Sequence, residues 1–150
     1  MSDHWIRFIP VDPTFIPSQE QGLRATELLR QFAPQADEVL VEQSDGVRFV
    51  DCGENWEGVS CPRCQADLEE WWSEAMSTAF ANSFSDLAVR TPCCKTHTSL
   101  SDLVYKWPVG FSRWSIEARN ANIGGNIRSD QHSELESAVG CQLKVIHSMY

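Results

Sequence analysis

The sequence Cys61-Pro62-Arg63-Cys64, followed later by Pro92-Cys93-Cys94, governs the fold of the middle of this chain. Two thiolates from one tight turn can grip a metal ion, and a second pair brought alongside completes a tetrahedron. Zinc suits such a site, because it has no geometric preference of its own and favours sulfur and nitrogen ligands. The cysteine pairs therefore predict a zinc site closed by four protein ligands, which is structural and not catalytic.

The exact ligand set depends on the second pair. Adjacent cysteines can face one ion only if the backbone bends sharply between them, and His97 is the alternative ligand in place of Cys93. Knuckle turns often have glycine after the second cysteine, whereas this chain has Gln65 and Lys95. A disulfide or free thiols are the other interpretations, although paired cysteines in a reducing compartment are more typical of metal ligands.

Composition restricts the classes of partner. The chain has 12 Lys+Arg against 21 Asp+Glu and a net charge of -9, which argues against a nucleic-acid partner and suits a basic protein. No stretch approaches the roughly 20 apolar residues that span a bilayer, so no membrane partner is expected. The start of the chain lacks the basic and apolar parts of a secretory signal, which predicts a cytoplasmic protein.

Periodicity in the first third of the chain predicts a strand, a helix and a hairpin. Residues 5–9 alternate as a strand. Ser18 and Gln21 form a capping box for a helix that ends before Pro34. Asp45-Gly46 lies between the apolar runs 39–41 and 47–50 and predicts a tight hairpin turn.

The last third of the chain predicts a strand, a helix and a strand. Residues 113–119 alternate as a half-buried strand. Ser133 and Glu136 predict the capping box of a short helix that Gly140 ends. Residues 143–147 alternate again. The order matches β-α-β-β…β-α-β, an α+β fold with an antiparallel sheet, helices on one face and a plan compatible with the ferredoxin-like fold.

The middle of the chain is predicted to be an insertion in a single domain of residues 1–150. Residues 52–108 form this zinc-ribbon-like lobe, with a helix over 66–81, a short strand at 87–90 and a short helix over 99–107. A lobe with a small apolar core of its own benefits from a metal clip.

A partner-binding surface is predicted beside the metal site. Tryptophan is enriched at interfaces although it also fills cores, and Trp56 and Trp71 are the ones expected to be exposed. The acidic residues expected to surround them are Glu54, Glu57, Glu70 and Glu74. This surface predicts a small protein-binding module with a basic partner, such as an immunity-type inhibitor or a regulator.

Two alternatives stay open. A hydrolase-like enzyme would use acids such as Asp51, Glu54 and Glu57 between sheet and insertion, although no catalytic residue can be assigned. Cys52 lies among acids that would raise its pKa, so it is predicted to be packed and not nucleophilic. A zinc ribbon that binds nucleic acid would have to gather its cations on one face, namely Arg63, Arg90, Lys95 and Lys106.

Five segments carry a resemblance to a known family: residues 49–55, 61–64, 71–72, 92–94 and 100–111. In these segments the chain resembles a family of small, uncharacterised bacterial proteins with a CPxC…PCC zinc-ribbon-like insertion and no established activity. The family commonly has glycine after each cysteine pair, from which Gln65 and Lys95 depart. The resemblance implies a bacterial, self-standing protein with a zinc-ribbon-like insertion.

Overall fold

The computed structural model describes residues 2–150 and confirms the α+β class. The elements are, in order, β1 His4–Pro10, α1 Gln19–Phe32, β2 Glu38–Val50, β3 Val59–Ser60, α2 Glu69–Ala81, β4 Ala88–Arg90, β5 His97–Ser99, the 3-10 helix η1 Leu100–Asp102, β6 Val104–Tyr105, β7 Gly110–Arg119, α3 Ser129–Val139 and β8 Leu143–Met149.

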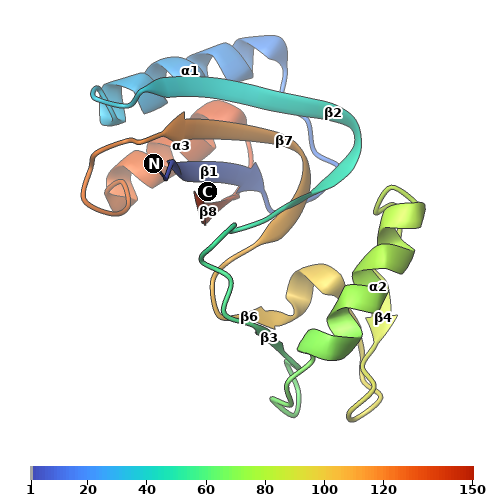
Figure 1. Cartoon of the computed structure of the whole chain (residues 1–150). Helices are drawn as coiled ribbons and strands as arrows, with labels where there is room; N and C mark the ends of the chain where they lie inside the picture. The colour runs from blue at the N-terminus through green and yellow to red at the C-terminus, as the bar shows by residue number, and fades with distance from the viewer. Residues whose placement is uncertain (1) are drawn as a thin grey trace.

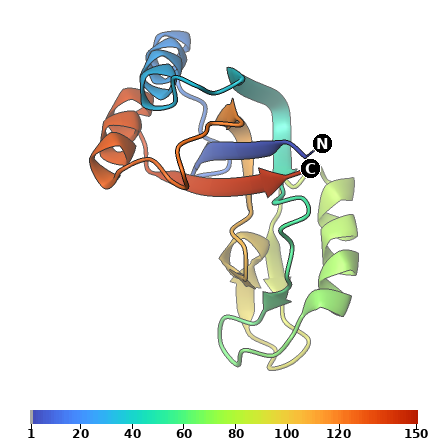
Figure 2. The ribbon, with the colours of Figure 1, turned by 60° about the vertical axis from the view of Figure 1, so that its left-hand side comes forward.

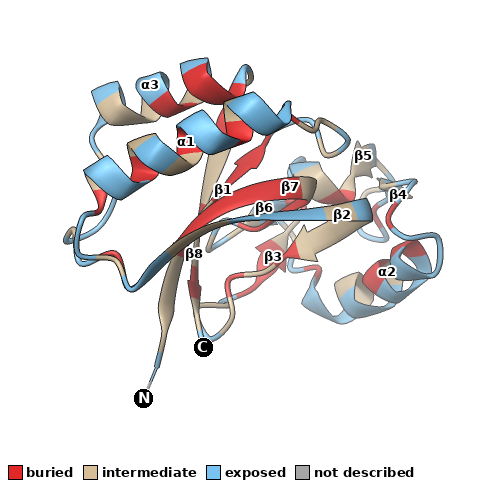
Figure 3. Ribbon diagram, turned by 90° about the horizontal axis from the view of Figure 1, so that it is seen from above, coloured by how far each residue is buried: buried red, intermediate tan, exposed pale blue. Residues whose placement is uncertain are grey.

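Four strands form one antiparallel sheet in the order β2-β7-β1-β8, and α1 and α3 cover one of its faces (Figures 1 and 2). This is the predicted ferredoxin-like plan. Its core contains Phe8 of β1, Trp114 and Ile116 of β7, Leu29 of α1 and Leu135 of α3. Buried residues lie on the strands and on the sheet-facing sides of these two helices (Figure 3).

The helix α1 begins as its sequence predicts. Ser18 Oγ accepts a hydrogen bond from Gln21 N at 3.1 Å, and Gln21 Oε1 accepts one from Ser18 N at 2.8 Å. This reciprocal cap satisfies two backbone donors that the first turn leaves without helical partners.

The predicted hairpin around Asp45-Gly46 is wrong. Both halves of β2 pair with β7 instead of with each other, and Gly46 does not adopt the positive φ that a two-residue hairpin turn requires. The register shifts between Gln43 and Arg48, whose partners are Trp114 and Ser112, so β2 contains extra residues that form a bulge. The long strand β7 gives both halves a complete ladder, which a local turn signal does not reveal.

β7 is one of the two central strands of the sheet and is buried on both faces. The prediction of a half-buried strand is therefore wrong. Ser115 and Glu117 are 0% and 5% exposed. Both side chains lie on the sheet face that points away from the helices. There Ser115 Oγ donates a hydrogen bond to Glu117 Oε2, and Arg7 Nε lies 3.3 Å from Glu117 Oε1. The rings of Trp5 and Tyr150 flank the Arg7 guanidinium. The polar side chains of this strand are therefore buried because they form hydrogen bonds and an ion pair with one another and with Arg7.

The helix α3 begins earlier than the capping box at Ser133 predicts. Gln131 Oε1 accepts a hydrogen bond from Arg128 N, and the helix starts at Ser129. Glu136 serves the other end, since its Oε2 accepts a hydrogen bond from Leu143 N at 2.7 Å. Gly140 ends the helix in the left-handed conformation, as predicted.

We call residues 51–109, between β2 and β7, the insertion segment. It lies at one end of the sheet, on the side away from α1 and α3 (Figures 1 and 2). Its core contains Val59, Leu68, Met76 and Leu100, and Phe111 of β7 packs into the same core. The insertion segment therefore has apolar packing that is separate from the core under the helices and joined to it through the long strands.

Two helices of the insertion segment differ from prediction. α2 starts at Glu69 and not near Ala66, because Cys61 N donates to Ala66 O and the chain is still completing a turn there. The helix predicted over 99–107 is only one 3-10 turn, followed by β6, which pairs with β3. Tyr105 Oη donates to Leu100 O at 2.6 Å and draws the chain into that extended path. No helix of residues 2–150 is long and apolar enough to cross a membrane.

Candidate metal centre

The first cysteine pair lies in a knuckle turn that follows β3. Cys61 N donates to Ala66 O at 2.9 Å, and Gln65 N donates to Cys61 O at 3.0 Å. These bonds close the turn so that residue 65 must have positive φ, and Gln65 has φ 66°. A non-glycine residue pays a steric cost in this conformation, which explains why such turns often have glycine here.

The second pair lies in an equivalent turn between β4 and β5. Thr91 N donates to Thr96 O at 3.0 Å, and Lys95 N donates to Thr91 O at 3.1 Å, with Lys95 at φ 59°. Thr91 therefore occupies the position of Cys61 in the first turn, and Cys93 occupies that of Arg63. Because the turn already bends sharply, adjacent Cys93 and Cys94 can face the same point.

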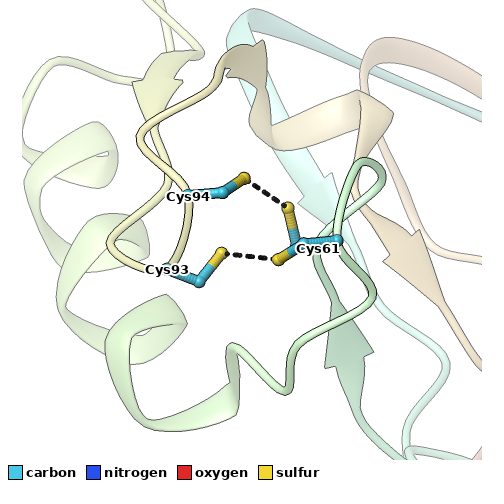
Figure 4. A group of neighbouring side chains, drawn as sticks. Cys61, Cys93 and Cys94 are labelled. Carbon is cyan, nitrogen blue, oxygen red and sulfur yellow. Dashed lines mark hydrogen bonds between the residues drawn. The ribbon is translucent and has the colours of Figure 1, made fainter.

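The two turns bring the four sulfur atoms together. The Sγ atoms of Cys61, Cys64, Cys93 and Cys94 all lie within 4.8 Å of one another. Cys61 and Cys94 are 3.7 Å apart and Cys64 and Cys93 are 3.3 Å apart, and Figure 4 shows Cys61, Cys93 and Cys94 directed toward one point. A tetrahedron with metal–sulfur bonds of about 2.3 Å has edges of about 3.8 Å. The cluster can therefore hold a metal ion.

The sulfur atoms are not bonded to one another. A disulfide requires about 2.05 Å between the sulfurs, and every cysteine of the described residues is free. His97 lies in β5 outside the cluster of ligand atoms, which contains Cys93 instead.

The protonation of the cluster is uneven. The backbone N–H of Cys64 has the largest effect and lowers the pKa of the Cys61 thiol. Desolvation opposes it, and smaller contributions from the backbone N–H of Arg63 and the thiols of Cys93 and Cys94 bring that pKa to about 6. The backbone N–H of Ala66 lowers the pKa of Cys64, but hydrogen bonds with the other three thiols together with desolvation outweigh it and raise that pKa to about 12. Neighbouring thiolates repel one another, so some of the four cysteines keep their protons while others lose them. A bound cation would remove that repulsion and favour the thiolate form of all four.

The other two cysteines differ in setting. Cys52 is 1% exposed, and burial, with a smaller contribution from Asp51, raises its pKa. Burial likewise raises the pKa of Cys141 to about 11. Both thiols are therefore held protonated, the opposite of what a nucleophile needs.

The predicted partner surface is only partly exposed. Its acids Glu54, Glu57, Glu70 and Glu74 are exposed, but Trp56 and Trp71 are half-buried, so the prediction of exposed tryptophans is wrong. Both rings pack against the core of the insertion segment. The Trp56 ring also stacks on Trp72 at 4.6 Å, and its Nε1 donates to Glu69. Trp56 therefore serves packing.

A polar cavity of about 230 Å³ lies on the sheet face opposite the helices. Asp51 lines it together with Arg7, Glu42, Arg48 and Glu117, while Glu54 and Glu57 do not. The acids named for an enzymatic site thus do not converge there. The cations named for nucleic-acid binding are all exposed, and Arg90 Nε donates to Lys95 O.

Thr91 is the residue of the centre that sequence reasoning missed. It is 1% exposed, and its Oγ1 lies 3.7 Å from Cys94 Sγ. The available signal was the alignment of Thr-Pro-Cys-Cys-Lys over 91–95 with Cys-Pro-Arg-Cys-Gln over 61–65. That alignment predicts a common turn in which one ligand has moved by two positions, from the place of Thr91 to Cys93.

No protein-family model matches this chain, and no curated protein or solved structure shows significant similarity to it. The resemblance to a family of small bacterial proteins therefore stays a hypothesis. The structure supports one part of this resemblance, the four-cysteine cluster. The chain is thus an α+β protein whose four cysteines could hold a metal ion.

Proposed function

We propose that this protein is a small zinc-containing module that binds another protein, as an immunity-type inhibitor or a regulator. The observation that carries the proposal is the cluster of four sulfur atoms supplied by two knuckles of the chain itself. Four thiolates complete the coordination of zinc, so the ion has no open position for water or substrate. Its role is then to hold the insertion segment together.

Zinc is the proposed ion because of the donor set. Tetrahedral sites of four thiolates select zinc or iron, and both require deprotonated ligands. Free thiols also require a reducing compartment, which supports a cytoplasmic location.

A protein partner is proposed from charge. The net charge of -9 would accelerate the approach of a basic partner. Glu54, Glu57, Glu70 and Glu74 are exposed within the insertion segment, and Trp71 of the same segment is half-buried. These residues form the proposed acidic face of the insertion segment.

Elemental analysis of the protein purified under reducing conditions tests the proposal. We expect one zinc per chain, lost on Cys64→Ser and kept on Cys141→Ser. Native pull-down from the source cells should recover a specific basic protein whose binding weakens steeply with salt. A chain without bound zinc, or the absence of any specific partner, would contradict the proposal.

A further inference from the structure

The two edges of the four-stranded sheet differ. The C-terminal end of the β8 edge is covered by the insertion segment, since Gly53 bridges to Met149 and Glu54 N donates to Met149 O at 2.7 Å. β2 lies at the other edge. Within residues 2–150, the backbone of positions 38–43 forms hydrogen bonds to β7 and to no other strand. An antiparallel strand turns half of its N–H and C=O groups to each side, so the outer half here faces solvent.

An apolar hollow of about 470 Å³ lies beside this open edge, between α1 and β2. Trp114 and Ile16 line it, together with Leu23 of α1 and Val41 of β2. Leu23 is 62% exposed and Val41 is 37% exposed, whereas Trp114 is 2% exposed. α1 therefore leaves part of the apolar face of β2 uncovered, with room for aliphatic side chains.

Charge and apolar surface alternate along the edge. Val41 is paired with Ile116 of the helix-side core, so Val39 and Val41 face the helices. Glu38 and Glu42 face the opposite side and are exposed, and Glu38 Oε1 lies 3.7 Å from Arg119 Nε, its cross-strand partner on β7. The edge thus has two acids on one face and two valines on the other.

We propose that β2 binds an extended basic segment of a partner protein as a fifth strand of the sheet. Basic side chains lie opposite Glu38 and Glu42, and aliphatic side chains lie opposite Val39 and Val41, one of them in the hollow. The main-chain hydrogen bonds supply affinity and the alternate side chains supply specificity. This inference rests on the proposed function and names the partner segment as basic–aliphatic–any–aliphatic–basic, a pattern that is the same in both strand directions.

A second copy of this chain fits the edge poorly in the register that pairs residues 38–42 with themselves. Two-fold pairing centred on Leu40 puts Glu38 of each copy opposite Glu42 of the other, and like charges directly opposite destabilise a sheet. Edge charges and bulges are the usual devices against self-pairing. Here the bulge begins after Gln43, so positions 38–43 keep a continuous register with β7 and their charges still admit a basic strand.

Titration of the isotope-labelled full chain with the acetylated peptide Thr-Lys-Val-Thr-Val-Lys-Thr tests this inference. We expect amide shifts at positions 38–43 and a shift of the Trp114 indole. The Glu38→Lys/Glu42→Lys double variant should bind this peptide about 10-fold more weakly, since two cross-strand attractions become repulsions. The same variant should bind the peptide with glutamate in place of lysine more tightly than the unmodified chain does. Methylation of the peptide amides should abolish binding, because strand addition needs those donors.

The matched control is Asp102→Lys/Glu134→Lys, which makes the same change of net charge at two exposed positions outside β2 and the hollow and should leave binding unchanged. If the control abolishes binding and the edge variant does not, the edge assignment is overturned while the proposed function stands. Absence of shifts at 38–43 at millimolar peptide also overturns it. Dimerisation of the chain through these positions would do the same, by showing that a second copy occupies the edge.

Discussion

Loss of the metal should loosen the insertion segment and leave the four-stranded sheet folded. Cys64→Ser is the cleanest perturbation, because Cys64 is exposed and its loss removes a ligand without opening the core. A closed metal site cross-links the chain as a disulfide does, and Cys64 and Cys93 are 29 positions apart. The chain-entropy relation for a loop of that length gives about 3.6 kcal/mol at 25 °C.

Amide hydrogen exchange measures this change residue by residue. A local loss of about 3.6 kcal/mol speeds exchange by about 400-fold in the segment that opens. We expect this acceleration over residues 65–92, which include α2, and unchanged protection in β1, β7 and β8. The separate apolar core beneath α1 and α3 is the reason for the difference.

Cys141→Ser is the control, because Cys141 packs at the edge of the other core and lies outside the sulfur cluster. It should keep both the metal and the slow exchange of residues 65–92. Unchanged exchange in that segment after the metal has been removed would refute the reasoning. Simultaneous loss of protection in the sheet would also refute it, by showing that the two cores unfold as one unit.

Three further predictions concern stability. Glu117→Gln should destabilise the protein by about 3 kcal/mol in urea denaturation, because it leaves the partly buried Arg7 guanidinium without its ion-pair partner 3.3 Å away, and adding Arg7→Met should restore much of the loss. Burial, and next the neighbouring His4, lowers the pKa of His147, so the folded state disfavours its charged form. Its contribution to stability is therefore present above pH 6.5 and lost as the pH falls through the lowered pKa, and His147→Gln should flatten the dependence of Tm on pH between 5 and 7. Gln65→Gly should raise stability by about 0.5–1 kcal/mol and slow zinc release to a chelator, since Gln65 has φ 66°; a fall in stability would show that the turn is not strained.

Local signals predicted the elements whose causes are local. Ser18 and Gln21 satisfy the first turn of α1 from within the same turn, and Gly140 ends α3 because it alone tolerates the left-handed conformation there without strain. The cysteine pairs likewise predicted their own cluster, since each knuckle closes by hydrogen bonds over only a few residues. Such interactions require no knowledge of the rest of the fold.

The errors lie where distant partners determine the outcome. Asp45-Gly46 has the composition of a turn, but β7 pairs with both of its flanks, and a ladder with a distant strand outweighs one local turn. Glu117 alternates like an exposed residue, yet Arg7 of another strand makes its burial tolerable. The open edge of β2 follows from the strand order, in which no strand of residues 2–150 pairs with its outer side, and from α1, which covers only part of its apolar face. The residue types and their short-range spacing thus determine caps, knuckles and strand tendencies, while pairing and burial depend on which surfaces meet across the folded chain, and only the tertiary structure decides that.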